Sequence, residues 1–139
     1  MAKVISGFPG IGKTWLGQNK LNCIDLDSSR WKDHDEYMFI IERIWLNLSD
    51  DSYLLVSSHI DVRERLIERG IAFYFVLPEP DLGEEYRRRY VSRGTPQSLV
   101  DLIMDNWESW TEDPLDDALQ RVVRLGSGSH LLDILDDLV

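Results

Sequence analysis

The chain has 139 residues, a length that fits a single folded domain. Hydrophobic residues make up 43% and charged residues 29%, which excludes a disordered chain, and no apolar stretch approaches the roughly 18 residues needed to cross a bilayer. The formal net charge of −10 repels polyanions. We therefore expect no nucleic-acid partner, whereas a small phosphorylated ligand in a local basic pocket is compatible with this charge.

The start of the chain and its single cysteine set further expectations. An apolar run and a glycine-rich loop come first, so we expect no signal peptide and a cytoplasmic protein. Cys23 is the only cysteine, which excludes an intramolecular disulfide and a cysteine-based metal cluster and predicts a buried, apolar role. The sequence leaves the oligomeric state open.

Apolar runs alternate with helical patterns, which favours an α/β domain with a parallel sheet, formed by the whole of residues 1–139. Strands are predicted at residues 3–6, 22–26, 53–57, 71–77 and 121–125. Helices are predicted after the first strand, at residues 36–48 and at residues 62–69.

Residues 7–14 read G-F-P-G-I-G-K-T and follow the first predicted strand, which is the context of a phosphate-binding P-loop. Glycines let the backbone bring its N–H groups against phosphate oxygens at the positive end of the next helix. Lys13 would supply a cation for the β- and γ-phosphates, and the Thr14 hydroxyl would bind Mg²⁺. The residues predicted to hold a nucleoside triphosphate are Gly7, Pro9, Gly10, Ile11, Gly12, Lys13 and Thr14. The alternative is an ordinary glycine turn before a helix.

Two carboxylates, Asp25 and Asp27, stand at the end of the second predicted strand, on the same side of it and at the sheet edge where α/β proteins bind ligands. One would orient Mg²⁺ and the other would accept a proton from an attacking hydroxyl. The sequence does not decide between them, and Asp25 joins Thr14 as the candidate on the metal side. The alternative has Asp27 capping a turn and Asp25 paired with an arginine.

The third predicted strand ends in Ser57-Ser58-His59, without a carboxylate that could position Mg²⁺. These residues are candidates for hydrogen bonds to a substrate, and capping of a helix that begins near Asp61 is the alternative for Ser58 and His59. Trp31 would either stack on the base of a second substrate or pack in the core, and most of the other tryptophans are expected to pack. The loop at residues 126–129 would either lie against the adenine of ATP or form an ordinary turn.

Residues 82–110 have a helical pattern that is broken at Gly94-Thr95-Pro96, where Thr95 is a predicted N-cap and Pro96 the first residue of a second helix. Arg89 and Arg93 share one helix face, from which they would stabilise the charge of a phosphoryl group in transfer. The alternative is a solvated face with ion pairs from Glu84 to Arg88 and from Glu85 to Arg89.

Taken together, these blocks resemble the small P-loop kinases of the adenylate kinase and shikimate or gluconate kinase group, and above all the short adenylate-kinase-like proteins of phages and bacteria. The matching blocks are G-F-P-G-I-G-K-T at 7–14, D-L-D-S-S at 25–29, V-S-S-H at 56–59 and E-E-Y-R-R-R-Y-V-S-R-G at 84–94, with Val62-Arg63, Leu66 and Asn106-Trp107. The resemblance implies a P-loop NTPase three-layer sandwich, with a five-stranded parallel sheet in the order 2-3-1-4-5. It also implies ATP and Mg²⁺ at the P-loop and a short helical lid at about residues 82–110.

In that family Asp25 and Asp27 match the paired acids of sugar and shikimate kinases, and Arg89 and Arg93 match the lid arginines of nucleotide kinases. The chain departs from adenylate kinases in its reduced lid and in lacking an Asp-Gly-x-Pro-Arg block after the third strand. The expected function is ATP- and Mg²⁺-dependent phosphoryl transfer to a small acceptor, a nucleoside or nucleoside monophosphate first. The alternatives are a nucleotide-binding regulatory module, a kinase acting on a modified base in phage DNA, against which the net charge argues, and a slow NTPase.

Overall fold

The computed structural model describes residues 1–26 and 33–138. Five strands form one parallel sheet in the order β2-β3-β1-β4-β5. Their bounds are β1 Lys3–Gly7, β2 Cys23–Asp25, β3 Tyr53–Ser57, β4 Phe73–Pro78 and β5 Gln120–Leu125. The expected α/β class, the parallel sheet and the strand order are thereby confirmed. Asp27 and Trp31 lie outside the described residues.

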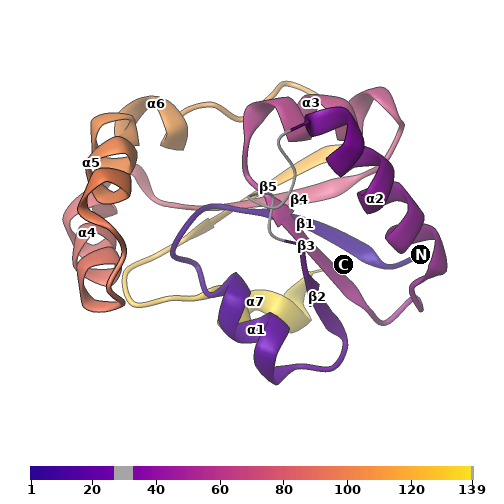
Figure 1. Ribbon diagram of the computed structural model, residues 1–139, viewed down its shortest axis with the longest axis horizontal. Helices are drawn as coiled ribbons and strands as arrows, with labels where there is room; N and C mark the ends of the chain where they lie inside the picture. The colour runs from indigo at the N-terminus through magenta and orange to yellow at the C-terminus, as the bar shows by residue number, and fades with distance from the viewer. Residues whose placement is uncertain (27–32, 139) are drawn as a thin grey trace.

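Helices cover both faces of the sheet (Figure 1). On one face lie α1 (Lys13–Asn19) and α7 (Leu131–Ile134), and on the other lie α2 (His34–Asn47) and α3 (Ile60–Glu68). The connection from β4 to β5 contains α4 (Gly83–Ser92), α5 (Gln97–Asp105) and α6 (Trp107–Thr111). Short 3-10 helices occur at η2 (Pro80–Leu82) and η3 (Leu135–Asp137).

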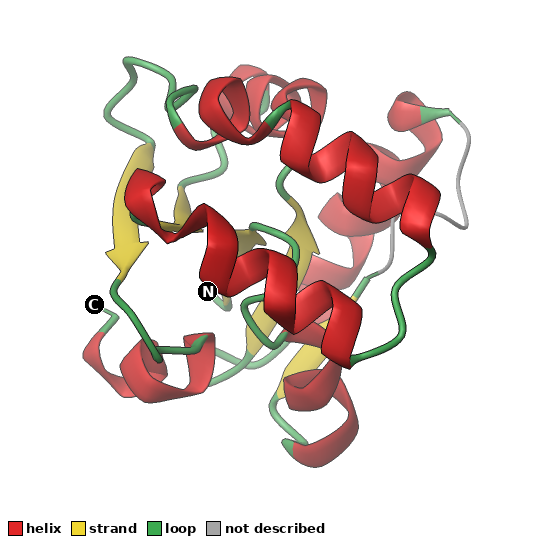
Figure 2. Cartoon of the chain, turned by 90° about the vertical axis from the view of Figure 1, so that its left-hand side faces the viewer, coloured by secondary structure: helices red, strands yellow, loops and turns green. Residues whose placement is uncertain are grey.

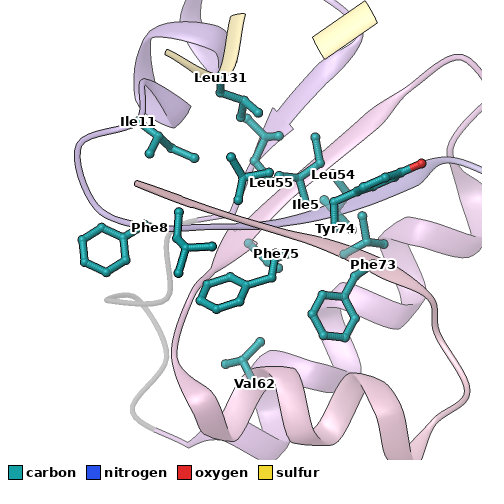
Figure 3. Close-up of a cluster of buried hydrophobic side chains, with 14 of the residues drawn as sticks. Ile5, Phe8, Ile11, Leu54, Leu55, Val62, Phe73, Tyr74, Phe75 and Leu131 are labelled. Carbon is teal, nitrogen blue, oxygen red and sulfur yellow. The ribbon is translucent and has the colours of Figure 1, made fainter. Parts of the chain in front are cut away.

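The core fills both spaces between the sheet and its helices, because the side chains of a strand alternate between its faces. Phe73 and Phe75 of β4 lie on the side of Val62 from α3, whereas Ile11 and Leu131 lie on the opposite side (Figure 3). All of these side chains are buried. Cys23 is buried as predicted, and this burial raises the pKa of its thiol. Within the described residues, no helix is long and apolar enough to cross a bilayer.

The helical segment after β4 differs in detail from the prediction. The helix α5 begins at Gln97, so Pro96 is the residue before the helix and not its first residue. Thr95 does not cap α5, because its hydroxyl accepts a hydrogen bond from Arg93 Nε (3.0 Å) and the Pro96 backbone is extended. The predicted break itself is confirmed, since α4 ends at Ser92 and α5 starts five residues later.

The position of α4 and α5 determines where a ligand can bind. Figure 1 shows them beyond the carboxyl end of the sheet, facing the loop between β1 and α1, and Figure 2 shows them crossing in front of the strands. Two side-chain contacts join α4 to that loop: the Tyr90 hydroxyl donates to the Pro9 carbonyl (2.7 Å), and Arg89 Nη1 donates to the Gly10 carbonyl (3.0 Å). Because ligands of open parallel sheets bind at the carboxyl edge, the space between the loop and α4 is the place to look for a site.

Candidate functional site

The glycine-rich loop at residues 7–14 requires glycine for two physical reasons. Gly10 and Gly12 have φ values of 91° and 100°, a left-handed region that residues with a Cβ rarely adopt. A Cβ on Gly10 would also approach Tyr90 Cε1 to 2.8 Å, so α4 leaves no space for a side chain there. The loop conformation therefore depends on these residues and on the packing of α4.

The backbone N–H groups of this loop are available to a ligand. Those of Gly10, Ile11, Gly12 and Thr14 donate to no acceptor within residues 1–26 and 33–138. Hydrogen bonding within the protein resumes at Leu16, whose N–H donates to the Gly12 carbonyl (3.1 Å). Successive N–H groups without protein acceptors, in a backbone that alternates through left-handed glycines, form a concavity that binds anions.

The residues that follow the loop add a cation and a hydroxyl. Lys13 Nζ donates to the Gly7 carbonyl, which places the ammonium across the loop. Thr14 is exposed in the first turn of α1. The side chain of Ile11 is buried in the core (Figure 3), so Ile11 offers only its backbone, and its carbonyl accepts from Leu131 N–H (2.8 Å).

Lys13 and Thr14 line a cavity of about 1370 Å³ between the loop, the end of β2 and α4. Among the described residues its charged lining comprises three cations, Lys13, Arg89 and Arg93, and one carboxylate, Asp25. The cavity is therefore locally cationic in a chain of net charge −10. Such a field favours a small anionic ligand.

Asp25 is the last residue of β2 and lies in the cavity wall. A Cβ on Gly17 would come within 2.7 Å of Asp25 Cβ, so the close packing of α1 against β2 depends on that glycine. This packing brings Asp25 into the same cavity as Thr14, 11 residues earlier in the chain. Two oxygen donors of the type that Mg²⁺ prefers thus line the same cavity.

The two candidate arginines both line the cavity but have different surroundings. The Arg89 side chain is 15% exposed and donates to the Gly10 carbonyl (3.0 Å), the Ser129 carbonyl (2.9 Å) and Glu85 Oε2 (3.2 Å). Arg93 is exposed at the end of α4, and its guanidinium lies 5.1 Å from the centre of the Tyr90 ring. Arg89 thus has three protein acceptors, whereas Arg93 presents an exposed guanidinium to the cavity.

The alternative interpretation of α4 included two ion pairs, of which the structure contains one. Glu85 pairs with Arg89 (3.2 Å), but Glu84 pairs with Arg87 (3.6 Å) and not with Arg88. Glu85 also accepts from the Ser127 hydroxyl (2.5 Å) and from Gly128 N–H (3.0 Å), and these hydrogen bonds lower the pKa of its carboxyl group. The loop after β5 is thereby attached to α4. Sequence reasoning did not find this attachment, because its partners lie 42 and 43 residues apart.

The residues after β3 lie in two different environments. Ser57 and Ser58 line the large cavity, and the Ser57 Oγ accepts from His59 N–H (3.1 Å). His59 precedes α3 and caps it through its backbone carbonyl, since its side chain makes no capping hydrogen bond. The imidazole of His59 is not part of the cavity lining and lies 5.2 Å from that of His34, measured between ring centres.

Sequence reasoning missed several residues of the cavity lining, and Trp15 and His130 are the two with rings. Trp15 is 50% exposed and lines both the large cavity and a second one of about 250 Å³, where it meets His130. Trp45 and Trp107 pack as expected, since their indole N–H groups donate to the Ala2 and Pro80 carbonyls (2.9 and 2.8 Å). The position of Trp15 next to Thr14 could have indicated that it lies at the site, because both residues are in the exposed first turn of α1.

Comparison of the chain with known proteins found no matching family model, no matching curated protein and no matching solved structure.

Proposed function

We propose that the protein is an ATP- and Mg²⁺-dependent phosphotransferase that acts on a small acceptor, a nucleoside or nucleoside monophosphate. The observation that carries the proposal is the set of loop N–H groups without protein acceptors. These groups lie beside Lys13 in the loop that lines a cationic cavity. A triphosphate is the ligand that matches this combination, because its oxygens need several donors in succession and its charge needs a cation.

Two oxygen donors in the cavity lining support a magnesium ion beside the phosphates. Thr14 and Asp25 would hold it, directly or through water, since Mg²⁺ favours hydroxyl and carboxylate oxygens and keeps part of its water shell. When bound, the ion would neutralise charge on the phosphate oxygens. Asp27, the second predicted acid, remains a prediction for the acceptor side.

The size of the cavity supports a second ligand. At about 1370 Å³ it exceeds the range of roughly 300 to 1,000 Å³ that is typical of a site for one small molecule. Ser57 and Ser58 offer hydrogen bonds on the side away from α4, where an acceptor would lie. A cavity that binds two ligands side by side promotes transfer between them by holding the reacting groups together.

Arg93 and Arg89 would have different roles at the phosphates. Arg93, exposed and at the cavity wall, is the group that would stabilise charge on the transferring phosphoryl group. Arg89 would hold the loop and α4 in position through its contacts with Gly10 and Ser129. The indole of Trp15 and the imidazole of His130 offer flat surfaces for the base of the nucleotide at the smaller cavity.

Two observations favour a nucleotide-binding module without catalysis as the second candidate. Arg89 donates to three protein acceptors, and β3 ends at Ser57, which is followed by Ser58 and not by a carboxylate. If Asp27, which lies outside the described residues, does not act as a base, the site retains only binding groups. The two candidates make different predictions for turnover.

The test is ADP release from ATP and Mg²⁺ with a panel of nucleosides, nucleoside monophosphates and small hydroxy acids. We expect acceptor-dependent ADP that falls at least about 100-fold in Lys13→Ala, because an electrostatic contact to the reacting phosphates is worth several kcal/mol in the transition state. Asp25→Asn with Asp27→Asn should keep ATP affinity and lose turnover. Tight ATP binding without turnover on any acceptor would instead support the binding module, and transfer that survives in Lys13→Ala would refute the proposed mechanism.

A further inference from the structure

Outside the large cavity, two histidines and an aspartate come together at the starts of two helices. His34 is the first residue of α2, His59 immediately precedes α3, and Asp61 lies in the first turn of α3. One donor atom from each of the three side chains lies within 4.8 Å of the other two. His34 Nδ1 is 3.2 Å from Asp61 Oδ2, and the rings of His34 and His59 are 5.2 Å apart between centres.

We propose that His34, His59 and Asp61 bind a divalent transition-metal ion of the zinc class, with at least one coordination position open to water or an anionic ligand. Metal–ligand bonds of about 2.0 to 2.2 Å place neighbouring ligands of one ion about 3 to 3.5 Å apart. The distance of 3.2 Å from His34 Nδ1 to Asp61 Oδ2 already fits that spacing. Rotation of the exposed imidazole of His59 would bring its nitrogen from within 4.8 Å of the other two donor atoms to the same spacing.

The two imidazole nitrogens of the cluster favour a transition-metal ion over Mg²⁺. Imidazole nitrogen suits Zn²⁺, Ni²⁺ and Cu²⁺, whereas Mg²⁺ takes oxygen ligands almost exclusively. The site therefore differs in kind from the oxygen donors Thr14 and Asp25. Within the described residues the cluster supplies three ligands, and three protein ligands with an open position are typical of a reactive zinc centre, whereas structural zinc sites use four.

The supporting structure fixes the two helix starts relative to each other. The Tyr37 hydroxyl donates to the Leu26 carbonyl (2.8 Å) and accepts from Ser57 N–H (3.2 Å), which attaches the start of α2 to the end of β3. Arg65 Nε donates to Asp35 Oδ1 (2.9 Å), which joins α3 to α2. A preorganised ligand set loses less entropy when the ion binds.

Some of the charges around the cluster oppose a bound cation and others favour it. Two helix N-termini and Arg65, whose Nη1 donates to the Asp61 carbonyl (3.4 Å), oppose a cation, while Asp35 offsets Arg65 through their ion pair. The net charge of −10 draws cations to the surface as a whole. The ion that binds must therefore form strong bonds to nitrogen, which again selects the zinc class over Mg²⁺.

The test uses the full chain, stripped of metal with EDTA and desalted, and titrated with Co²⁺ in excess Mg²⁺ while the visible absorbance is followed. We expect saturable binding of one Co²⁺, displaced by Zn²⁺. Loss of an outer-shell partner alone weakens metal binding roughly 10- to 100-fold, so His59→Ala should weaken it at least about 100-fold. Asp61→Asn should also weaken it, and His130→Ala, which removes the histidine outside the cluster, should not.

A second measurement guards against variants that fold poorly. Zn²⁺ should raise the Tm of the wild type and leave the Tm of His59→Ala unchanged, while circular dichroism shows that both are folded. The proposal is wrong if the wild type shows no saturable Co²⁺ binding. It is equally wrong if His59→Ala binds Co²⁺ as the wild type does, or if His130→Ala loses binding to the same extent.

Discussion

At the scale of single residues, the structure separates positions that look equivalent in the sequence. Arg89 and Arg93 are four residues apart and both reach the large cavity, yet Arg89 is largely buried with three acceptors and Arg93 is exposed. The glycines differ in a similar way. Gly10 and Gly70 both have positive φ, but a Cβ would collide with Tyr90 only at Gly10, because Gly70 has open space around it.

This difference gives the first prediction. Gly10→Ala should lower the free energy of unfolding by more than the roughly 1 kcal/mol that left-handed strain alone costs, and it should abolish nucleotide binding, since the loop must move away from Tyr90. Gly70→Ala is the matched control: it carries the strain without the collision and should bind nucleotide as the wild type does. Urea denaturation and a fluorescent-nucleotide titration measure the two effects. Equal behaviour of the two variants would contradict the assigned role of the loop packing.

At the scale of elements, the carboxylate of Glu85 joins three parts of the molecule. It contacts Arg89 within α4 and also Ser127 and Gly128 in the loop after β5. Arg89 in turn contacts the glycine-rich loop at Gly10. The position of α4 over the cavity thus depends on a carboxylate whose charge is removed at low pH.

The second prediction concerns this dependence on pH. Hydrogen bonds from Ser127 and Gly128, with the charge of Arg89, lower the pKa of Glu85 in the folded protein. Stability from Glu85 is therefore fully present above the unfolded pKa of about 4.3 and is lost as the pH falls through the lower, folded pKa. Glu85→Gln should have a lower Tm than the wild type at pH 6, and the gap should narrow as the pH falls below the unfolded pKa and close once the pH is below the folded pKa. Glu112→Gln, at an exposed glutamate, is the control, and a gap that does not change with pH would count against this contact.

The sequence predicted what is encoded over short distances. The glycine pattern at residues 7–14, the strands and the break before α5 follow from neighbouring residues, and the resemblance to small P-loop kinases supplied the strand order that the structure confirms. It missed what depends on residues far apart in the chain. The contacts of Glu85 with Ser127 and of His34 with Asp61 join elements whose relative placement no local pattern specifies. Thr95 was misassigned for a local reason: its hydroxyl accepts a hydrogen bond from Arg93, two residues earlier in the chain.

At the scale of the whole molecule, a buried arginine connects α3 with the segment that leads into β5. Arg63 is 1% exposed, its Nη2 lies 2.8 Å from Asp113 Oδ2, and its guanidinium stacks 3.9 Å from the centre of the Phe75 ring. Its Nε donates to the carbonyl of Ser58, one of the residues that line the large cavity (2.9 Å). Burial lowers the pKa of Arg63 and Asp113 opposes that effect, so the free-energy cost of burying this charge depends on Asp113.

The third prediction follows from that dependence. Asp113→Ala should lower the free energy of unfolding by about 3 kcal/mol, the low end for breaking a buried ion pair, because the Asp113 side chain is 24% exposed and its Oδ1 lacks a hydrogen-bond partner among the described residues. Combining it with Arg63→Met should restore part of this loss, since an apolar side chain then replaces the unpaired charge. Asp116→Ala, at an exposed position in the same segment, should change stability by less than about 0.5 kcal/mol. Urea denaturation of the four proteins measures these differences. A double variant less stable than Asp113→Ala would mean that the guanidinium is held by the carbonyls of Ser58 and Asp113 and not by the carboxylate, because those hydrogen bonds are lost only when Arg63 is removed.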